Sequence, residues 1–198
     1  MHLLRKCPCP VWLITPQAPP SCRRILAAID VDDVFPPAEL TSRRALNRQV
    51  LELAVSLARS DAAELHIVHA WDAMGERVMR RAWTQVSEER VGTYVEQVRQ
   101  RREDSVDKLV HEVTSHSGLD VHDALRPHTH LVRGAARKEV PALAHRIEAD
   151  LLVMGTVGRT GVSGFLIGNT AETILNQISC SVLAIKPPGF VTPVTTEG

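Results

Sequence analysis

The sequence has no excess of charge of either sign and no long apolar run. Its 198 residues include 23 Lys and Arg against 23 Asp and Glu, so the formal net charge is zero. Such a balance gives no broad attraction to nucleic acid or to an anionic membrane, and we expect neither as a partner. The longest apolar stretches, such as LLVMG at 151–155 and VWLI at 11–14, are far shorter than a membrane-spanning helix.

A secretory signal and a metal-binding cysteine pattern are also missing. The N-terminal region has no long apolar segment with a small-residue cleavage site, so we expect a cytoplasmic protein. The sequence has four cysteines, Cys7, Cys9, Cys22 and Cys180. They form no C-x-x-C pair of the kind found in structural zinc sites, and His128 and His130 have no second cluster at ligand spacing. We therefore expect reduced thiols and no metal site built from Cys and His.

Short apolar runs alternate with amphipathic segments through most of the chain. Strands are predicted at 23–30, 64–71, 128–134, 150–155 and 180–187. Helices are predicted at 41–61, 73–117, 135–149 and 169–179, where apolar residues recur every three or four positions. The charge-rich 73–117 segment is one long helix or a helix broken once. This alternation predicts an α/β fold, an open five-stranded parallel sheet sandwiched by helices.

Capping signals and one proline set the expected helix ends. Thr41 or Ser42 can cap the first helix, and Asn169 with Thr170 forms the start signal of the last. Pro141 must lie near the start of its helix or bend it, because proline cannot donate a backbone hydrogen bond.

A glycine-rich loop follows the fourth predicted strand, at the sheet edge where open α/β folds bind ligands. It reads GTVGRTGVSGFLIGNT from Gly155 to Thr170 and leads into a helix. The glycines allow close backbone approach, the helix start favours an anion, Arg159 adds a cation and Asn169 adds a donor. The loop has no Walker ending and does not follow the first strand as a dinucleotide fingerprint does. Two interpretations stay open, a phosphate site and a glycine-rich turn that only packs.

The spacing of Gly155, Gly158, Gly168 and Asn169 resembles the nucleotide-binding signature of the universal stress protein superfamily. The segments ILAAID, ELHIVHAW, ADLLVMGTVGRTG and CSVLAIKP resemble that family as well. The resemblance covers residues 23–187 and is greatest to the second domain of the tandem, E-type members. It implies a Rossmann-like sheet with strand order 3-2-1-4-5 and ATP lying across the strand ends.

The resemblance also implies a set of nucleotide-binding residues. They are Ala28, Asp30, Ala70, Met154, Gly155, Gly158, Arg159, Gly168, Asn169 and Thr170. Asp30 would meet the phosphates through Mg²⁺ or Mn²⁺, and the backbone of Ala70 would meet adenine. The three glycines would surround ribose and phosphates. Asn169 departs from the family pattern, in which Ser or Thr is usual.

Three functions follow as hypotheses. The first is an ATP-binding stress-response regulator that acts through dimerisation or partner contact. The second is an interaction module of the same fold that binds no nucleotide. The third is an enzyme of the wider nucleotide-binding class, such as a nucleotidyl transferase or a hydrolase. The sequence shows no nucleophile elbow and no Ser-His-Asp set, so we expect no enzyme beyond slow ATP hydrolysis.

The first residues of the chain repeat its last predicted strand. LLRKCPCPVWLITP at 3–16 aligns without a gap with ILNQISCSVLAIKP at 174–187. We therefore expect residues 1–20 to be the last strand and linker of a preceding universal stress domain, cut just inside that domain's last helix. Residues 21–188 would form a second such domain, and 189–198 a flexible tail.

The strand predicted near the N-terminus should pair with the sheet. We expect residues 10–15 to lie antiparallel beside 181–186, which covers an otherwise exposed sheet edge. Burial of Val11, of Leu13 or Trp12, and of Ile14 is expected from that pairing. The last strand would also carry contact with a second copy or a tandem domain.

Overall fold

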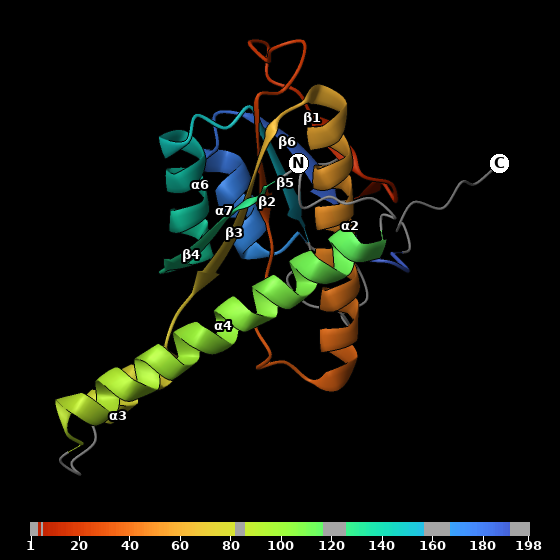
Figure 1. Cartoon of the computed structure of the whole chain (residues 1–198). Coiled ribbons are helices and arrows are strands. Elements are labelled where there is room, and N and C mark those ends of the chain that lie inside the picture. The colour runs from red at the N-terminus through yellow and green to blue at the C-terminus, as the bar shows by residue number, and fades with distance from the viewer. Residues whose placement is uncertain (1–3, 5, 82–85, 117–125, 157–166, 191–198) are drawn as a thin grey trace.

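One six-stranded sheet runs through the molecule (Figure 1). The computed structural model describes residues 4, 6–81, 86–116, 126–156 and 167–190. The strands are β1 (Val11–Leu13), β2 (Arg24–Ala28), β3 (Glu64–Trp71), β4 (His128–Arg133), β5 (Leu151–Gly155) and β6 (Ser181–Ile185). They lie in the order β1-β6-β5-β2-β3-β4, with β2 to β6 parallel and β1 antiparallel to β6. The predicted order of the five parallel strands is confirmed.

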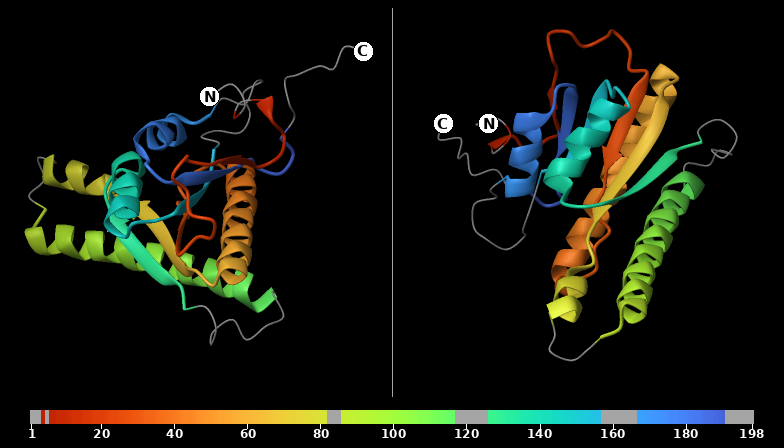
Figure 2. Two further views of the ribbon diagram at one scale, coloured as in Figure 1. Left: turned by 90° about the horizontal axis from the view of Figure 1, so that it is seen from above. Right: turned by 90° about the vertical axis from the view of Figure 1, so that its left-hand side faces the viewer.

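Helices cover both faces of this sheet. They are α2 (Pro37–Asp61), α3 (Met74–Arg81), α4 (Glu88–His116), α6 (Ala136–Arg146) and α7 (Asn169–Gln177). Helices α2 and α4 lie on one face and α6 and α7 on the other (Figure 2). The predicted 73–117 helix is broken once, between α3 and α4. No helix formed by the described residues is long and apolar enough to cross a membrane.

The parallel strands form the centre of the core. Ile25, Leu26 and Ala27 of β2 are fully buried, because β2 has a strand on each side and helices on both faces. Ile25 and Ala27 point toward α2 and α4, whereas Leu26 packs with residues of α6 and α7. Burial on both faces explains why the sequence of β2 is continuously apolar rather than alternating.

Two helix starts differ from the prediction. Helix α2 begins at Pro37, so Thr41 and Ser42 lie inside it and neither is its cap. The hydroxyl of Thr41 instead donates to the carbonyl of Pro37. Proline at the first helical position needs no partner for its nitrogen and already has a helical φ, so the Pro36-Pro37 pair opens the helix. Helix α7 begins at Asn169 after Gly168 and has no side-chain cap, so the predicted Asn169 and Thr170 cap is wrong as well.

Helix α6 differs from the prediction at its end. Pro141 lies inside the helix, so of the two predicted alternatives a start near Pro141 is wrong and a bend at Pro141 stays a prediction. The helix ends at Arg146 instead of 149, because Glu148 adopts a left-handed backbone conformation with φ of 51°. A left-handed residue stops the helix and turns the chain into β5.

The predicted antiparallel edge strand is present. Val11 pairs with Ala184, and Leu13 pairs with Val182. The burial of its side chains was predicted wrongly, since only Val11 is buried and Ile14 is 69% exposed. Trp12 is 46% exposed because α2, on its side of the sheet, packs mainly on β2 and β5. The main attachments of the segment are therefore backbone pairing, Val11 and the buried Leu4 that precedes it.

Candidate functional site

The carboxyl ends of three neighbouring strands bring predicted site residues together. In the sheet register Ala28 of β2 lies opposite Val68 of β3 and Met154 of β5. Ala70 is two residues further along β3, and Gly155 ends β5. β2 lies between β3 and β5 in the sheet. The strands that follow β2 in the chain continue on the β3 side, and the last two parallel strands lie on the β5 side, so the direction of strand order reverses at β2. Open α/β sheets bind ligands at such a reversal.

Gly155 is required by the close approach of α2. A Cβ atom at this position would lie 2.6 Å from Cδ2 of Leu46 and 3.0 Å from its Cγ. Leu46 is itself buried, so it has little room to move aside. The glycine therefore has a packing role in addition to its predicted place at the ligand.

A backbone hydrogen bond joins the residue before α7 to the residue after β5. The backbone N–H of Gly168 donates to the carbonyl of Thr156 at 3.0 Å. Thr156 is fully buried, and its hydroxyl donates to the carbonyl of Ile185. These bonds place the exposed Asn169 and Thr170, the first residues of α7, beside the end of β5.

Two predicted residues of the glycine loop, Gly158 and Arg159, lie outside the described residues. Their assignment to the nucleotide site stays a prediction. The described part of the loop, Gly155, Thr156 and Gly168, establishes where the loop leaves and rejoins the domain.

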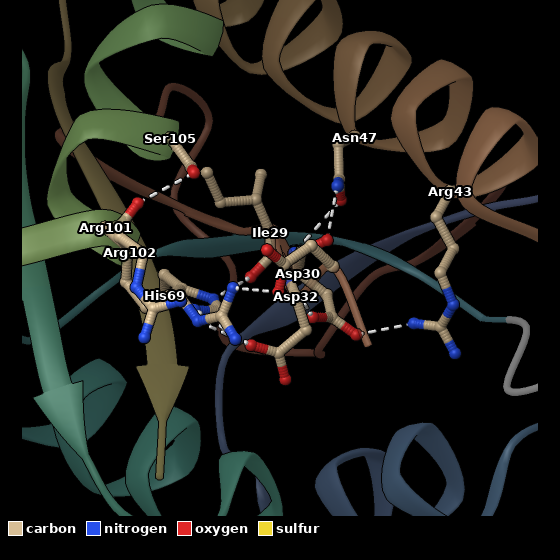
Figure 3. A network of polar contacts seen from close by, with 10 residues as sticks. Ile29, Asp30, Asp32, Arg43, Asn47, His69, Arg101, Arg102 and Ser105 are labelled. Atoms are coloured by element: carbon tan, nitrogen blue, oxygen red, sulfur yellow. Dashed lines mark hydrogen bonds and ion pairs between the residues drawn. The ribbon is translucent and has the colours of Figure 1, made fainter. Parts of the chain in front are cut away.

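Asp30 is held by helix α2 (Figure 3). Its backbone N–H donates to Oδ1 of Asn47 at 3.0 Å, and its carbonyl accepts from Nδ2 of Asn47 at 2.6 Å. Its carboxylate Oδ2 lies 2.6 Å from Nη1 of Arg43. Arg43 also pairs with Glu39 and stacks on the ring of Phe35. The predicted site carboxylate thus already has a cation beside it.

A second cluster joins the loop after β2 to helix α4. Arg102 lies 3.1 Å from Oδ1 of Asp32 and 2.7 Å from Oδ1 of Asp33. His69 of β3 is buried, and its Nδ1 donates to the carbonyl of Ile29. Its other ring nitrogen is 3.8 Å from Asp32. Figure 3 shows Asp30 and Asp32 side by side, between Arg43 on one side and Arg102 with His69 on the other.

The surroundings change the proton affinity of these groups. Burial raises the pKa of the Asp32 carboxyl, and the nearby Asp30 adds to this increase. The hydrogen bond from Arg102 lowers the pKa of Asp33. Burial lowers the pKa of His69, which favours the neutral ring. The cluster is therefore an ion-pair network of Arg102 with Asp32 and Asp33, and the neutral, buried His69 lies next to Asp32.

Sequence reasoning missed Arg43, Asn47, His69 and Arg102. A signal for Arg102 was present in α4. Val98 and Val106 are buried at four-residue steps on either side of it, so the arginine lies on the apolar face of the helix. A charged residue on such a face needs a partner, and Asp32 and Asp33 provide it.

The site residues fit a nucleotide better than they fit a metal ion. A glycine at a strand end and a helix start can face phosphates. Asp30, by contrast, has Oδ2 on Arg43 and Oδ1 accepting from the N–H of Asp32. Its carboxylate is not free to ligate a cation in this arrangement. Among the described residues no group of three or more His, Cys, Asp or Glu is placed to hold a metal ion.

A histidine cluster lies on the α6 face at the other end of the site strands. The register pairs His66 of β3 with His128 of β4, and their rings stack with centroids 4.9 Å apart. Nδ1 of His66 and Nε2 of His130 share a hydrogen bond of 3.0 Å. Strand pairing thus brings His66 beside His128 and His130, a contact that the spacing of histidines along the sequence did not indicate.

Acidification is expected to destabilise the protein through this cluster. Burial lowers the pKa of His66 and of His130, and the neighbouring rings add to the effect, whereas Glu64 opposes it at His66. A histidine in the unfolded chain has a pKa of about 6.5. The folded state binds fewer protons, so its stability is complete above that pH and is lost as the pH falls toward the lowered values.

The measurement is urea unfolding at a series of pH values between about 7.5 and 5. We expect the free energy of unfolding to fall with pH in the natural chain and to fall less in His66→Leu. His145→Leu, at an exposed position on α6, is the matched control and should follow the natural chain. Equal pH dependence of His66→Leu and His145→Leu would contradict the prediction.

Comparison with known proteins supports the fold. Residues 23–186 match the profile of the Universal stress protein family. The chain is 29% identical to universal stress protein E of Escherichia coli K12 over 197 residues, which is 99% of this chain and 57% of that protein. It is 32% identical to the universal stress protein E homolog of Haemophilus influenzae, over 94% of this chain and 55% of that protein. The chain thus spans about half the length of the curated relatives it matches.

Solved structures agree with this comparison. A functionally unknown protein of Pseudomonas aeruginosa PAO1 is 28% identical, with a TM-score of 0.66, over 94% of this chain and 55% of that one. Universal stress protein UspA of Lactobacillus plantarum is 17% identical, with a TM-score of 0.59, over 84% of this chain and 99% of that one. The second likeness supports the fold alone.

Proposed function

The chain belongs to the universal stress protein family, and on that premise we propose that it binds an adenine nucleotide, ATP, and acts as a cytoplasmic stress-response regulator. The nucleotide would lie across the carboxyl ends of β2, β3 and β5. The output would be contact with a partner or a second copy rather than catalytic turnover. The observation that supports this most is the tie between Gly168 and Thr156, which holds the start of α7 beside the end of β5.

Each part of the nucleotide has a counterpart at the site. Adenine would lie near Ala28 and the backbone of Ala70, at adjacent strand ends. Ribose and phosphates would lie over Met154 and Gly155 and reach Gly168, Asn169 and Thr170 at the start of α7. Free backbone N–H groups and the dipole at a helix start stabilise phosphate charge. Gly158 and Arg159 would complete the loop around the phosphates.

Arg43 changes the predicted role of Asp30. The resemblance assigns Asp30 to a nucleotide-bound Mg²⁺ or Mn²⁺, but Arg43 already neutralises this carboxylate at 2.6 Å. A divalent ion could reach Asp30 only if Arg43 moved away. We therefore propose that the nucleotide binds without a strict need for the metal, with the Arg43 guanidinium close by as a fixed positive charge.

The N-terminal segment supports a role in domain contact. β1 pairs with the outer edge of β6, where the resemblance places contact between two domains. We propose that residues 1–20 represent the last strand and linker of a preceding domain of the same kind, and that residues 21–188 form the nucleotide-binding domain. The tail predicted at 189–198 lies mostly outside the described residues.

The test of nucleotide binding is calorimetry of the chain with ATP, with and without Mg²⁺. Dissociation constants in the micromolar to millimolar range are expected, with little change on adding the metal. The informative variant is Thr170→Glu. A carboxylate in the first turn of a helix is favourable for the helix but repels phosphate, so we expect about a tenfold loss of affinity, about 1.4 kcal/mol, without loss of stability.

Two further measurements complete this test. Thr170→Gln introduces a side chain of the same shape as glutamate but without its charge. This variant should bind ATP nearly as the natural chain does. Arg43→Met should make binding depend on Mg²⁺, because Asp30 then becomes free to ligate it. Absence of any binding heat at millimolar ATP would reject the nucleotide hypothesis and favour the interaction module, a choice consistent with Asn169 at a position where Ser or Thr is usual.

A further inference from the structure

Two cysteines in the segment before β1 lie in contact. The Sγ atoms of Cys7 and Cys9 are 2.9 Å apart, joined by a thiol hydrogen bond. Cys9 is exposed and Cys7 is half-buried. Pro8 lies between them and Pro10 follows, and a proline ring fixes φ. The two thiols are therefore held together by a short and stiff stretch of chain, on the surface of the domain.

A buried lysine lies beneath this segment. Lys186, the residue after β6, is 6% exposed, and its ammonium group donates to the backbone carbonyl of Leu4. It also lies 4.9 Å from the centroid of the Phe190 ring. In the described part of the chain it makes no ion pair with a carboxylate. Burial lowers the pKa of Lys186, and the charge of Cys7 nearby opposes this decrease.

The two thiols differ in their proton affinity. The hydrogen bond from Cys9 lowers the pKa of Cys7, and the charge of Lys186 adds to this decrease. The same hydrogen bond raises the pKa of Cys9. Cys7 is thus the thiol that loses its proton more readily, and Cys9 is the hydrogen-bond donor that favours this loss. A pair of this kind, with one nucleophile and one resolving thiol nearby, has the arrangement that thiol–disulfide exchange requires.

The other two cysteines, Cys22 and Cys180, differ from Cys7 in the direction of their pKa shift. Burial, with Asp61 and Asp150 close by, raises the pKa of Cys22 to about 11. Burial also raises the pKa of Cys180 to about 11. Thiols with a raised pKa are poor nucleophiles at neutral pH. Cys22 and Cys180 are half-buried as Cys7 is, so the three differ in the direction of the pKa shift rather than in exposure.

We propose that Cys7 and Cys9 form a redox-active dithiol, which small disulfides such as glutathione disulfide convert reversibly into an intramolecular disulfide. This activity is separate from nucleotide binding, because it lies in the segment before β1 and not at the carboxyl ends of β2, β3 and β5. It assigns a chemical role to the C-P-C motif.

The exchange balances in two steps. The Cys7 thiolate attacks one sulfur of glutathione disulfide, a Cys7–glutathione bond forms, the glutathione S–S bond breaks and one glutathione thiolate leaves. Cys9 then loses its proton to that thiolate and attacks Cys7, so the Cys7–Cys9 bond forms and a second glutathione leaves. Counted from the Cys7 thiolate, the protein loses two electrons and the one proton of Cys9. Glutathione disulfide becomes one thiol and one thiolate, and that thiolate takes its proton from water. Dithiothreitol reverses both steps.

The experiment is peptide mapping of the chain after treatment with glutathione disulfide and alkylation of the remaining thiols. We expect a Cys7–Cys9 linkage, alkylated Cys22 and Cys180, and return of all thiols with dithiothreitol. Cys9→Ser should stop at a mixed disulfide on Cys7. A chain carrying Cys22→Ala and Cys180→Ala should behave as the natural chain does. Absence of the Cys7–Cys9 linkage, or reaction of Cys22 and Cys180 at the same rate as Cys7, would overturn the proposal.

Lys186 gives a second, independent measurement. Lys186→Met removes the charge beside Cys7 and should slow alkylation of Cys7 at neutral pH by about threefold or more, since only the thiolate reacts. Lys186→Arg keeps the charge and should preserve the rate. The same alkylation in urea, where Lys186 and Cys7 are separated, should be as slow as in Lys186→Met. An equal rate in the folded and the unfolded chain would contradict the role of the fold.

Discussion

Replacement of Arg102 by methionine is expected to destabilise the protein by about 2–3 kcal/mol. Arg102 is 9% exposed and neutralises both Asp32 and Asp33. Methionine can fill the same apolar surroundings on α4, but it leaves two carboxylates beside Asp30 with no cation from that side. The side chain of Asp32 is 33% exposed and that of Asp33 62%, so the loss of stability should be smaller than the roughly 3–5 kcal/mol that follows removal of one partner of a fully buried pair.

Urea unfolding at neutral pH measures this effect. Arg101→Met is the matched control, because Arg101 is the exposed neighbour on the same helix and its loss should cost little. The double variant Arg102→Met with Asp32→Asn should recover part of the stability, since the uncompensated charge is then absent. If Arg102→Met and Arg101→Met had equal effects, the cluster would contribute nothing to stability and our account of it would be wrong.

Deletion of residues 1–18 is expected to make the chain self-associate. The deletion removes β1 from the edge of β6, whose residues Ser181–Ile185 are all buried in the intact chain. It also removes the cover that Leu4 and Val11 give to the apolar cluster on that face. An exposed apolar strand with free N–H and C=O groups pairs readily with another copy, and antiparallel pairing about a two-fold axis makes the surface self-complementary.

Light scattering of the intact and the shortened chain at equal concentration, in reducing buffer, checks this expectation. The shortened chain is expected to have a larger average mass than the intact chain, or to aggregate. A full-length chain with Trp12→Ser and Ile14→Ser is the control, because it loses exposed apolar side chains but keeps the strand pairing. Unchanged mass of the shortened chain, together with rapid amide exchange at residues 11–13 of the intact chain, would show that β1 does not protect the edge.

The strands could be predicted from sequence because burial on both faces leaves a continuous apolar run. β2 and β5 are examples, and even the pairing of β1 with β6 followed from the match between the first and last segments. The side chains of β1 could not be predicted in the same way. Whether Trp12 or Ile14 is covered depends on how far the helices extend over the edge of the sheet, and the sequence of β1 carries no information on that.

The contacts of the site were harder to predict than its position. That Asp30 and Gly155 lie at one edge of the sheet could be predicted, because each lies at a strand end and strand ends meet at one edge of a parallel sheet. Arg43 and Arg102 lie far from those strands in sequence, on helices whose rotation and tilt decide which side chain reaches the edge. The His66 and His128 pair depends on strand register, which sequence patterns specify only weakly when polar residues lie on the face concerned.

The bond between Gly168 and Thr156 has a consequence for how this family member could change over time. It closes the glycine loop at its base, so the chain between these two residues begins and ends at fixed points whatever its length. Lengthening a closed loop costs only entropy, about 0.6 kcal/mol for each doubling. Insertions between Thr156 and Gly168 could therefore alter ligand preference while β5, α7 and their packing stay unchanged. Changes of specificity at this loop would then leave the stability of the domain nearly unaffected.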